Sequence, residues 1–136
     1  MSDNSARILW VEDDLGIASL YIVRMDMEGF TVRHCENAEK AFSALKEFTP
    51  DLILLDLMLP GTSGFDVLDK LRHDPQTANT KVVVLSALGR PEEIERATKL
   101  GSNEFIVKSQ ITLGELMDRL RKHMGLPGST GTAKSA

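Results

Sequence analysis

Five short apolar runs, rich in branched aliphatic residues, recur along the 136-residue chain and set the strongest constraint on its fold. They are Ile8–Val11, Thr31–Cys35, Leu52–Leu55, Val82–Leu85 and Phe105–Val107. Three of the runs are continuously apolar instead of alternating with polar residues. A continuous apolar run is typical of a parallel strand that is covered on both faces. The runs therefore predict a parallel sheet between two layers of helices.

Helical periodicity fills the segments between these runs. Apolar residues recur at helical spacing from Ala38 to Phe48. Thr112 and Glu115 form a capping-box pair before the last helical segment, and Pro91 suits the first position of the segment before it. Because strand and helix alternate with short connections, we expect a doubly wound α/β fold of the flavodoxin-like type. The expected sheet has five parallel strands in the order 2-1-3-4-5, with five helices.

The composition fits a single globular domain. Apolar residues make up 42% of the chain, charged residues 26%, and the net charge of −4 argues against a nucleic-acid surface. A single cysteine, Cys35, excludes an internal disulfide and fits a reducing compartment. The sequence has neither a signal-peptide core nor the roughly 20 apolar residues of a membrane span, so we expect a cytoplasmic protein. We expect one domain over residues 7–124, a flexible N-terminus over 1–6, and a flexible tail or linker stub over 125–136.

Charged and hydroxyl side chains stand at the carboxyl ends of four of the five predicted strands. They are Glu12, Asp13 and Asp14 after the first strand, Asp56 after the third, Ser86 after the fourth and Lys108 after the fifth. The second strand ends in His34, Cys35 and Glu36 and, as an edge strand, is expected to lie outside the site. Ligands of doubly wound sheets bind outside the carboxyl ends of the strands, so the convergence predicts a site there. Taken singly, Asp13 or Asp14 could instead cap a helix, and Asp56 could begin an Asx-turn.

The clustered carboxylates predict a cation. Carboxylates that are close together repel one another and favour protons or a metal ion. Oxygen ligands suit Mg²⁺, whereas His34, His73 and His123 are scattered without the spacing of a zinc site. A cation, a lysine and a hydroxyl around one carboxylate are the groups needed to hold a phosphoryl group on that carboxylate.

These residues resemble the receiver domain of bacterial two-component response regulators, in the single-domain architecture of chemotaxis-type receivers. The resemblance runs from about residue 7 to residue 124 and rests on the motifs ILWVEDD, LLDLMLPGTSG, VVVLSA and GSNEFIVKS. The family implies that Asp56 accepts the phosphoryl group and that Ser86 and Lys108 assist. It also implies a Mg²⁺ ion held by Asp13, Asp56 and the backbone carbonyl of Met58, with Glu12 acting through water. Phe105 matches the aromatic switch position.

The sequence departs from the family pattern at one position. The family's lysine is commonly followed by proline across a cis peptide bond, whereas Ser109 follows Lys108 here. A cis bond before a residue other than proline costs about 3 kcal/mol, so the loop either holds that strain or is trans and rearranged. Asp14 is an additional carboxylate, which we assign to capping the first helix.

The resemblance implies a signalling domain and not an enzyme beyond its own phosphorylation and dephosphorylation. The implied partners are a sensor histidine kinase or histidine phosphotransfer domain and a downstream protein, without nucleic acid or membrane, in a monomer or a phosphorylation-dependent dimer. The apolar side chains of Met58 and Leu88 are expected to exclude water and so to slow dephosphorylation. One alternative is a phosphatase with an aspartyl-phosphate intermediate, but Met58 stands where such enzymes place an acid–base aspartate. A second alternative is a degenerate receiver that acts unphosphorylated, but all the matched site residues are intact. A third is a receiver that forms part of a longer regulator with an output domain after residue 125, which the tail permits.

Overall fold

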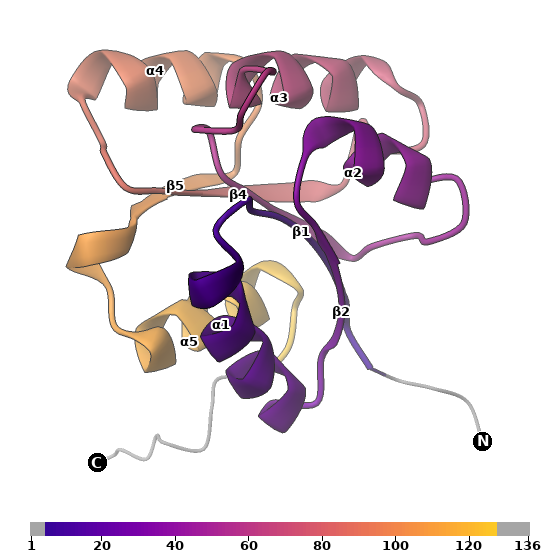
Figure 1. The fold of residues 1–136 in the computed structure, drawn as a ribbon, viewed down its shortest axis with the longest axis vertical. Helices are drawn as coiled ribbons and strands as arrows, with labels where there is room; N and C mark the ends of the chain where they lie inside the picture. Colours follow the sequence, from indigo (N-terminus) through magenta and orange to yellow (C-terminus); the bar gives the residue numbers. More distant parts are fainter. Residues whose placement is uncertain (1–4, 128–136) are drawn as a thin grey trace.

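The sheet has the predicted strand order, β2-β1-β3-β4-β5, with every pairing parallel. The structure is a computed structural model that describes residues 5–127 (Figure 1). The strands are β1 (Arg7–Val11), β2 (Thr31–Cys35), β3 (Leu52–Leu55), β4 (Lys81–Ser86) and β5 (Glu104–Val107). The helices are α1 (Leu15–Met27), α2 (Ala38–Ala44), α3 (Gly64–His73), α4 (Pro91–Lys99) and α5 (Leu113–His123), with a 3₁₀ turn at Lys108–Gln110.

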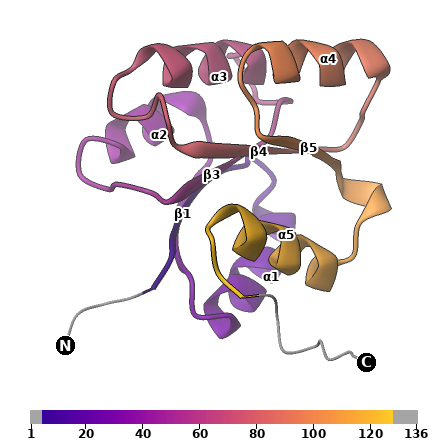
Figure 2. The same ribbon diagram turned by 180° about the vertical axis from the view of Figure 1, so that it is seen from behind.

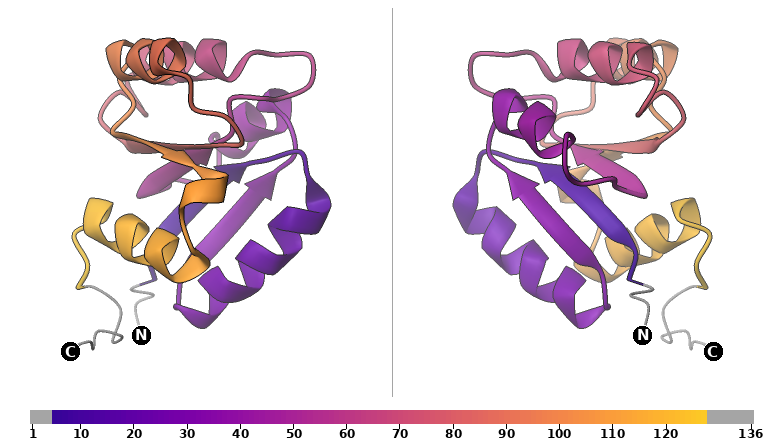
Figure 3. Two further views of the ribbon diagram at one scale, coloured as in Figure 1. Left: turned by 90° about the vertical axis from the view of Figure 1, so that its left-hand side faces the viewer. Right: turned by 90° about the vertical axis from the view of Figure 1, so that its right-hand side faces the viewer.

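Helices cover both faces of the sheet and give the core two halves. Figures 2 and 3 show α1 and α5 on one face and α2, α3 and α4 on the other. The central strands β1 and β3 are buried on both faces because alternate side chains enter the two halves, as Leu54 and Leu55 do. The doubly wound fold predicted from the continuous apolar runs is therefore confirmed.

The helix ends confirm three local predictions. Asp14 caps α1 by accepting hydrogen bonds from the Gly16 and Ile17 N–H groups. Thr112 and Glu115 form the predicted capping box of α5, and Pro91 is the first residue of α4. These residues fix where α1, α5 and α4 begin.

The expected domain over 7–124 lies within the described residues, whereas the expected N-terminal segment over 1–6 and the tail over 125–136 lie mostly outside them, at 1–4 and 128–136. Gly125 has a φ of 73°, and the Leu126 N–H donates to the carbonyl of Arg121, which closes α5. Leu126 packs against the α1–α5 half of the core. Within the described part of the chain, no helix is long and apolar enough to cross a membrane.

Gly64, the first residue of α3, lies directly against the chain that follows Asp56. Its N–H donates to the Leu57 carbonyl at 3.1 Å. A Cβ atom at this position would lie 2.4 Å from the Leu57 Cα and 2.8 Å from the Asp56 carbonyl oxygen. The close approach of α3 to this loop therefore requires glycine.

We predict that Gly64→Ala lowers the free energy of unfolding by about 1–3 kcal/mol, because backbone atoms must move to admit the methyl group. Urea denaturation would measure the loss. The matched control is Gly114→Ala in α5, where a Cβ atom would meet nothing closer than 3.6 Å. That variant should gain about 0.5–1 kcal/mol from helix propensity, and an equal response of the two variants would contradict the packing argument.

Candidate functional site

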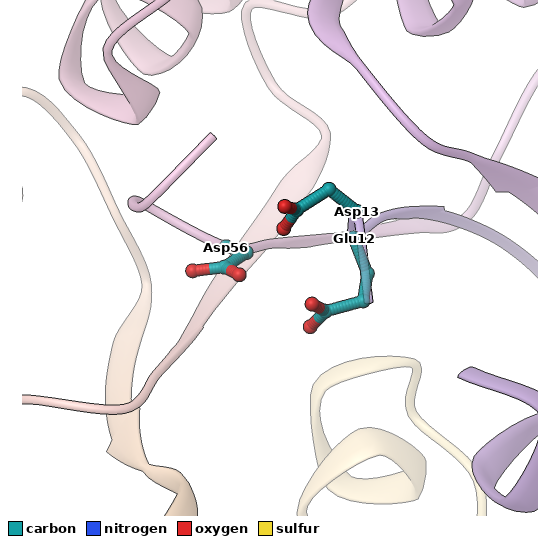
Figure 4. A group of neighbouring side chains, drawn as sticks. All are labelled: Glu12, Asp13 and Asp56. Carbon is teal, nitrogen blue, oxygen red and sulfur yellow. The ribbon is translucent and has the colours of Figure 1, made fainter. Parts of the chain in front are cut away.

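The carboxyl ends of four strands bring the predicted polar side chains to one edge of the sheet. Glu12 and Asp13 follow β1, Asp56 follows β3, Ser86 ends β4, and Lys108 follows β5. Figure 4 shows the side chains of Glu12 and Asp13 turned toward Asp56. One carboxylate oxygen from each of these three residues lies within 4.8 Å of the other two.

The three carboxylates differ in their exposure to solvent. Glu12 and Asp56 are buried, at 1% and 4% relative exposure, whereas Asp13 is exposed. A buried carboxylate is costly unless it is paired and hydrogen-bonded. The structure must therefore supply compensating charge at the two buried positions.

Lys108 supplies this charge. Its Nζ atom lies 2.8 Å from Glu12 Oε1 and 3.6 Å from Asp56 Oδ2. No peptide bond in the described residues is cis, so the bond between Lys108 and Ser109 is trans. The lysine thus reaches both carboxylates from a trans chain that continues into the 3₁₀ turn.

The pKa values of this pair follow from burial and contact. Burial raises the pKa of Glu12, and the hydrogen bond from Lys108 only partly opposes it. Burial alone would lower the pKa of Lys108, but its hydrogen bond to Glu12 and the nearby Asp56 charge outweigh burial and raise it. The second Glu12 oxygen, Oε2, accepts from the Asp14 N–H at 3.1 Å. Both oxygens of Glu12 therefore have protein partners.

Asp56 combines a turn with a place in the site. Its Oδ1 atom accepts from the Met58 N–H at 2.9 Å, which is the Asx-turn contact considered from the sequence. Its Oδ2 atom faces Lys108. Oδ1 therefore makes the Asx-turn, while Oδ2 lies beside the lysine that also bonds Glu12.

The remaining predicted residues differ in how deeply they are buried. Ser86 is buried, Phe105 is partly buried against the α2–α4 half of the core, and Met58 and Leu88 are exposed. A hollow of about 550 Å³ is lined by Asp13, Met58 and Ser86 among others. A larger groove of about 860 Å³ between α2 and α3 contains none of the predicted residues. The candidate site is therefore identified by the side chains that line the smaller hollow, and not by the volume of the hollow.

One contact that the sequence did not predict links the edge strand β2 to a residue of the acidic cluster. His34 Nε2 lies 2.7 Å from the backbone carbonyl oxygen of Glu12. The sequence around His34 does not indicate this contact, because the acceptor is a backbone atom and has no sequence signal. Only the strand register, which pairs His34 with Trp10, brings the ring close to Glu12.

Comparison with known proteins gives a consistent result. The sequence pattern described as the response regulator receiver domain matches residues 8–121. The DNA-binding dual master transcriptional regulator RpaA of Synechocystis sp. is 34% identical over 85% of the chain and 47% of RpaA. The phosphate regulon transcriptional regulatory protein PhoB of Escherichia coli is 36% identical over 87% of the chain and 51% of PhoB. The chain thus spans about half the length of the curated relatives it matches.

A solved structure of similar fold extends this comparison. The BeF3-activated N-terminal receiver domain of RstA from Klebsiella pneumoniae matches with a TM-score of 0.80 at 27% identity. The match covers 87% of this chain and 97% of that chain. The similarity therefore spans the sheet and the helices together.

We predict that Lys108→Met lowers the free energy of unfolding by about 3 kcal/mol near pH 8, because it leaves two buried carboxylates without a cation. The loss should be smaller near pH 5. The raised pKa of Glu12 means that its charged form destabilises the folded state as the pH rises above the ordinary value of 4.5. Without Lys108 this pKa rises further, so the destabilisation grows with pH.

Urea denaturation at the two pH values would test this expectation. The matched control is Lys99→Met, which removes a lysine from an exposed pair with Glu95. That variant should lose at most about 0.5 kcal/mol at either pH. A loss for Lys108→Met that is equal at the two pH values would contradict this account, because the substitution would then leave the pKa of Glu12 unchanged.

Proposed function

The chain belongs to the response regulator receiver domain family of two-component systems, and from this premise we propose that Asp56 accepts a phosphoryl group. The proposed donor is the phosphohistidine of a sensor kinase or histidine phosphotransfer domain. The observation that carries the proposal is the buried Asp56 carboxylate, which has one oxygen near Lys108 and lies within reach of two further carboxylates. We also propose that the protein acts in the cytoplasm, as a signalling domain and not as an enzyme on other substrates.

The donor set fits a magnesium ion. Three carboxylates that approach within 4.8 Å supply only hard oxygen ligands, which Mg²⁺ prefers. Asp13 and Asp56 would hold the ion directly, with the backbone carbonyl of Met58. Glu12 would act through water, because its two oxygens already bind Lys108 and the Asp14 N–H. When bound, the ion would neutralise charge on the transferring phosphoryl group.

In the proposed transfer, an Asp56 oxygen attacks phosphorus in line with the phosphorus–nitrogen bond of the donor. The new oxygen–phosphorus bond forms as the phosphorus–nitrogen bond breaks, and its electron pair returns to the donor imidazole. Lys108, now nearer Glu12 than Asp56, would shift onto a phosphoryl oxygen. Ser86 would donate its hydroxyl to another.

The outer face of α1 supports docking of a large donor. Four exposed hydrophobic residues of α1 are Leu15, Leu20, Val23 and Met27. A helix that is apolar on its outer side as well as its inner side needs a partner. Leu15 follows the capping Asp14, so this apolar face begins beside the acidic cluster. We therefore propose that the donor domain covers α1 while its phosphohistidine reaches Asp56.

The response is proposed to travel through the loop between β4 and α4. Gly89 in this loop lies against Phe105 and Val107, since a Cβ atom there would be 3.4 Å from the Phe105 ring and 2.4 Å from Val107 Cγ2. A hydrogen bond from Ser86 to the phosphoryl group on Asp56 would draw Ser86 and this loop toward Asp56. That movement would free space for the Phe105 ring to turn inward. Because α4 buries only Ala97, its packing is easily changed. The resulting shift would alter the α4–β5–α5 face that meets a downstream protein.

We predict that the protein, given Mg²⁺ and acetyl phosphate, gains a single phosphoryl group and that Asp56→Ala gains none. Intact-mass spectrometry and the stability of the label in acid, but not in base, would identify an acyl phosphate. Asp51→Ala, which removes another aspartate beside β3, is the matched control and should label normally. Chelation of Mg²⁺ should abolish labelling. Equal labelling of Asp56→Ala and the wild type would overturn the assignment.

We predict that replacing Met58 by Asn and Leu88 by Ser speeds loss of the phosphoryl group. Both side chains are exposed at 57% and 48%, where they can exclude water but cannot orient it. A gain on the order of tenfold corresponds to roughly 1.4 kcal/mol off the barrier. The measurement is the decay of phosphorylated protein after removal of the donor at constant Mg²⁺. Decay of the double variant at the wild-type rate would show that no apolar gate exists.

A further inference from the structure

Residues of β2 bind both the backbone N–H and the backbone carbonyl of Glu12. Its N–H donates to the Cys35 carbonyl at 3.0 Å, which continues the parallel ladder one step beyond β1. The ladder would next bring the Asn37 N–H to the Glu12 carbonyl. Within residues 5–127 no such backbone bond exists. The carbonyl is bonded instead to the imidazole of His34.

The direction of this hydrogen bond is fixed by chemistry. A carbonyl oxygen can only accept, so His34 Nε2 carries the hydrogen and donates it across 2.7 Å. The imidazole also contacts the buried ring of Trp10, with 5.6 Å between centroids, and Trp10 in turn stacks on Tyr21 at 5.4 Å. The aromatic packing holds the imidazole in the orientation that the hydrogen bond requires.

The acceptor of this bond is part of the peptide unit that joins the two acidic residues. Because a peptide unit is planar, fixing the Glu12 carbonyl also fixes the N–H and the Cα atom of Asp13. The Glu12 side chain departs from the other end of the same unit and holds Lys108 at 2.8 Å. One hydrogen bond from the edge strand thus acts on the peptide unit that joins the two acidic residues, and Glu12 in turn bonds the lysine.

We propose that His34 is a positioning residue for phosphoryl transfer, which it serves by holding the peptide unit between Glu12 and Asp13. The inference rests on the proposed function of Asp56. It assigns a role to the edge strand, which contributes no group to the reacting atoms. Loss of the donor leaves a buried carbonyl without a partner and lets this peptide unit rotate. The Asp13 oxygens and the Lys108 ammonium then lose their fixed positions.

Two substitutions separate the hydrogen bond from the packing. His34→Phe keeps a ring against Trp10 but removes the donor, whereas His34→Gln restores an N–H donor at a similar distance from the backbone. His73→Phe is the matched control. His73 is an exposed histidine on α3 whose ring lies against the Asp69 carbonyl and carboxylate within its own helix. Urea denaturation would establish that all three variants are folded.

Mg²⁺ affinity by calorimetry and the labelling rate with acetyl phosphate are the readouts. In His34→Phe we expect both to fall on the order of tenfold, the usual effect of removing a group that orients metal ligands. His34→Gln and His73→Phe should stay close to the wild type. In the absence of metal, the NMR chemical shift of the Lys108 side chain should change in His34→Phe and should match the wild type in His34→Gln.

The outcomes distinguish this inference from the proposed function. A wild-type protein that never labels on Asp56 contradicts the proposed function, while the Lys108 signal still tests the positioning role. A wild type that labels, together with an unchanged His34→Phe, overturns the positioning role alone. A His34→Gln variant as impaired as His34→Phe also overturns it, because the effect would then come from the shape of the ring and not from its donor.

Discussion

Two buried carboxylates, those of Glu12 and Asp56, share a single lysine, Lys108. The proposed function depends on this excess of negative charge. Glu12 and Asp56 are withdrawn from water, and Lys108 bonds the first while remaining close to the second. Each unpaired buried charge is costly, so the cluster favours a further cation and, once that is bound, an anionic group that both cations can hold. The same imbalance that costs stability provides the affinity on which the proposed chemistry depends.

The fold makes this cluster possible because parallel strands end together at one edge. Continuous apolar strands stay buried up to their last residues, and polar side chains follow or close the ends of β1, β3, β4 and β5 at one edge of the sheet. Short loops return at once to helices, and the cap at Asp14 and the close approach of Gly64 fix two of these loops. The loop after β4 is packed differently, against Phe105 and Val107, so a change at Ser86 has neighbours that can respond.

Much of this arrangement could be predicted from the sequence, because strand ends and helix caps have local signals. The five apolar runs predicted the sheet, and the strand-end rule brought Asp13, Asp56 and Lys108 together. The contact of His34 with Glu12 was missed, since a bond to a backbone carbonyl has no pattern in side chains. The trans bond before Ser109 could not be decided either, because both geometries allow a lysine at the end of β5.

The most direct test of the account is a crystal structure of the protein with Mg²⁺ and beryllium fluoride, which mimics a phosphoryl group on a carboxylate. The account predicts beryllium on an Asp56 oxygen and the metal ion on Asp13 and Asp56. It also predicts that Lys108 Nζ leaves Glu12 Oε1, now 2.8 Å away, to bond a fluoride. Beryllium fluoride absent from Asp56 at saturating concentration, with Lys108 still bound to Glu12, would contradict it.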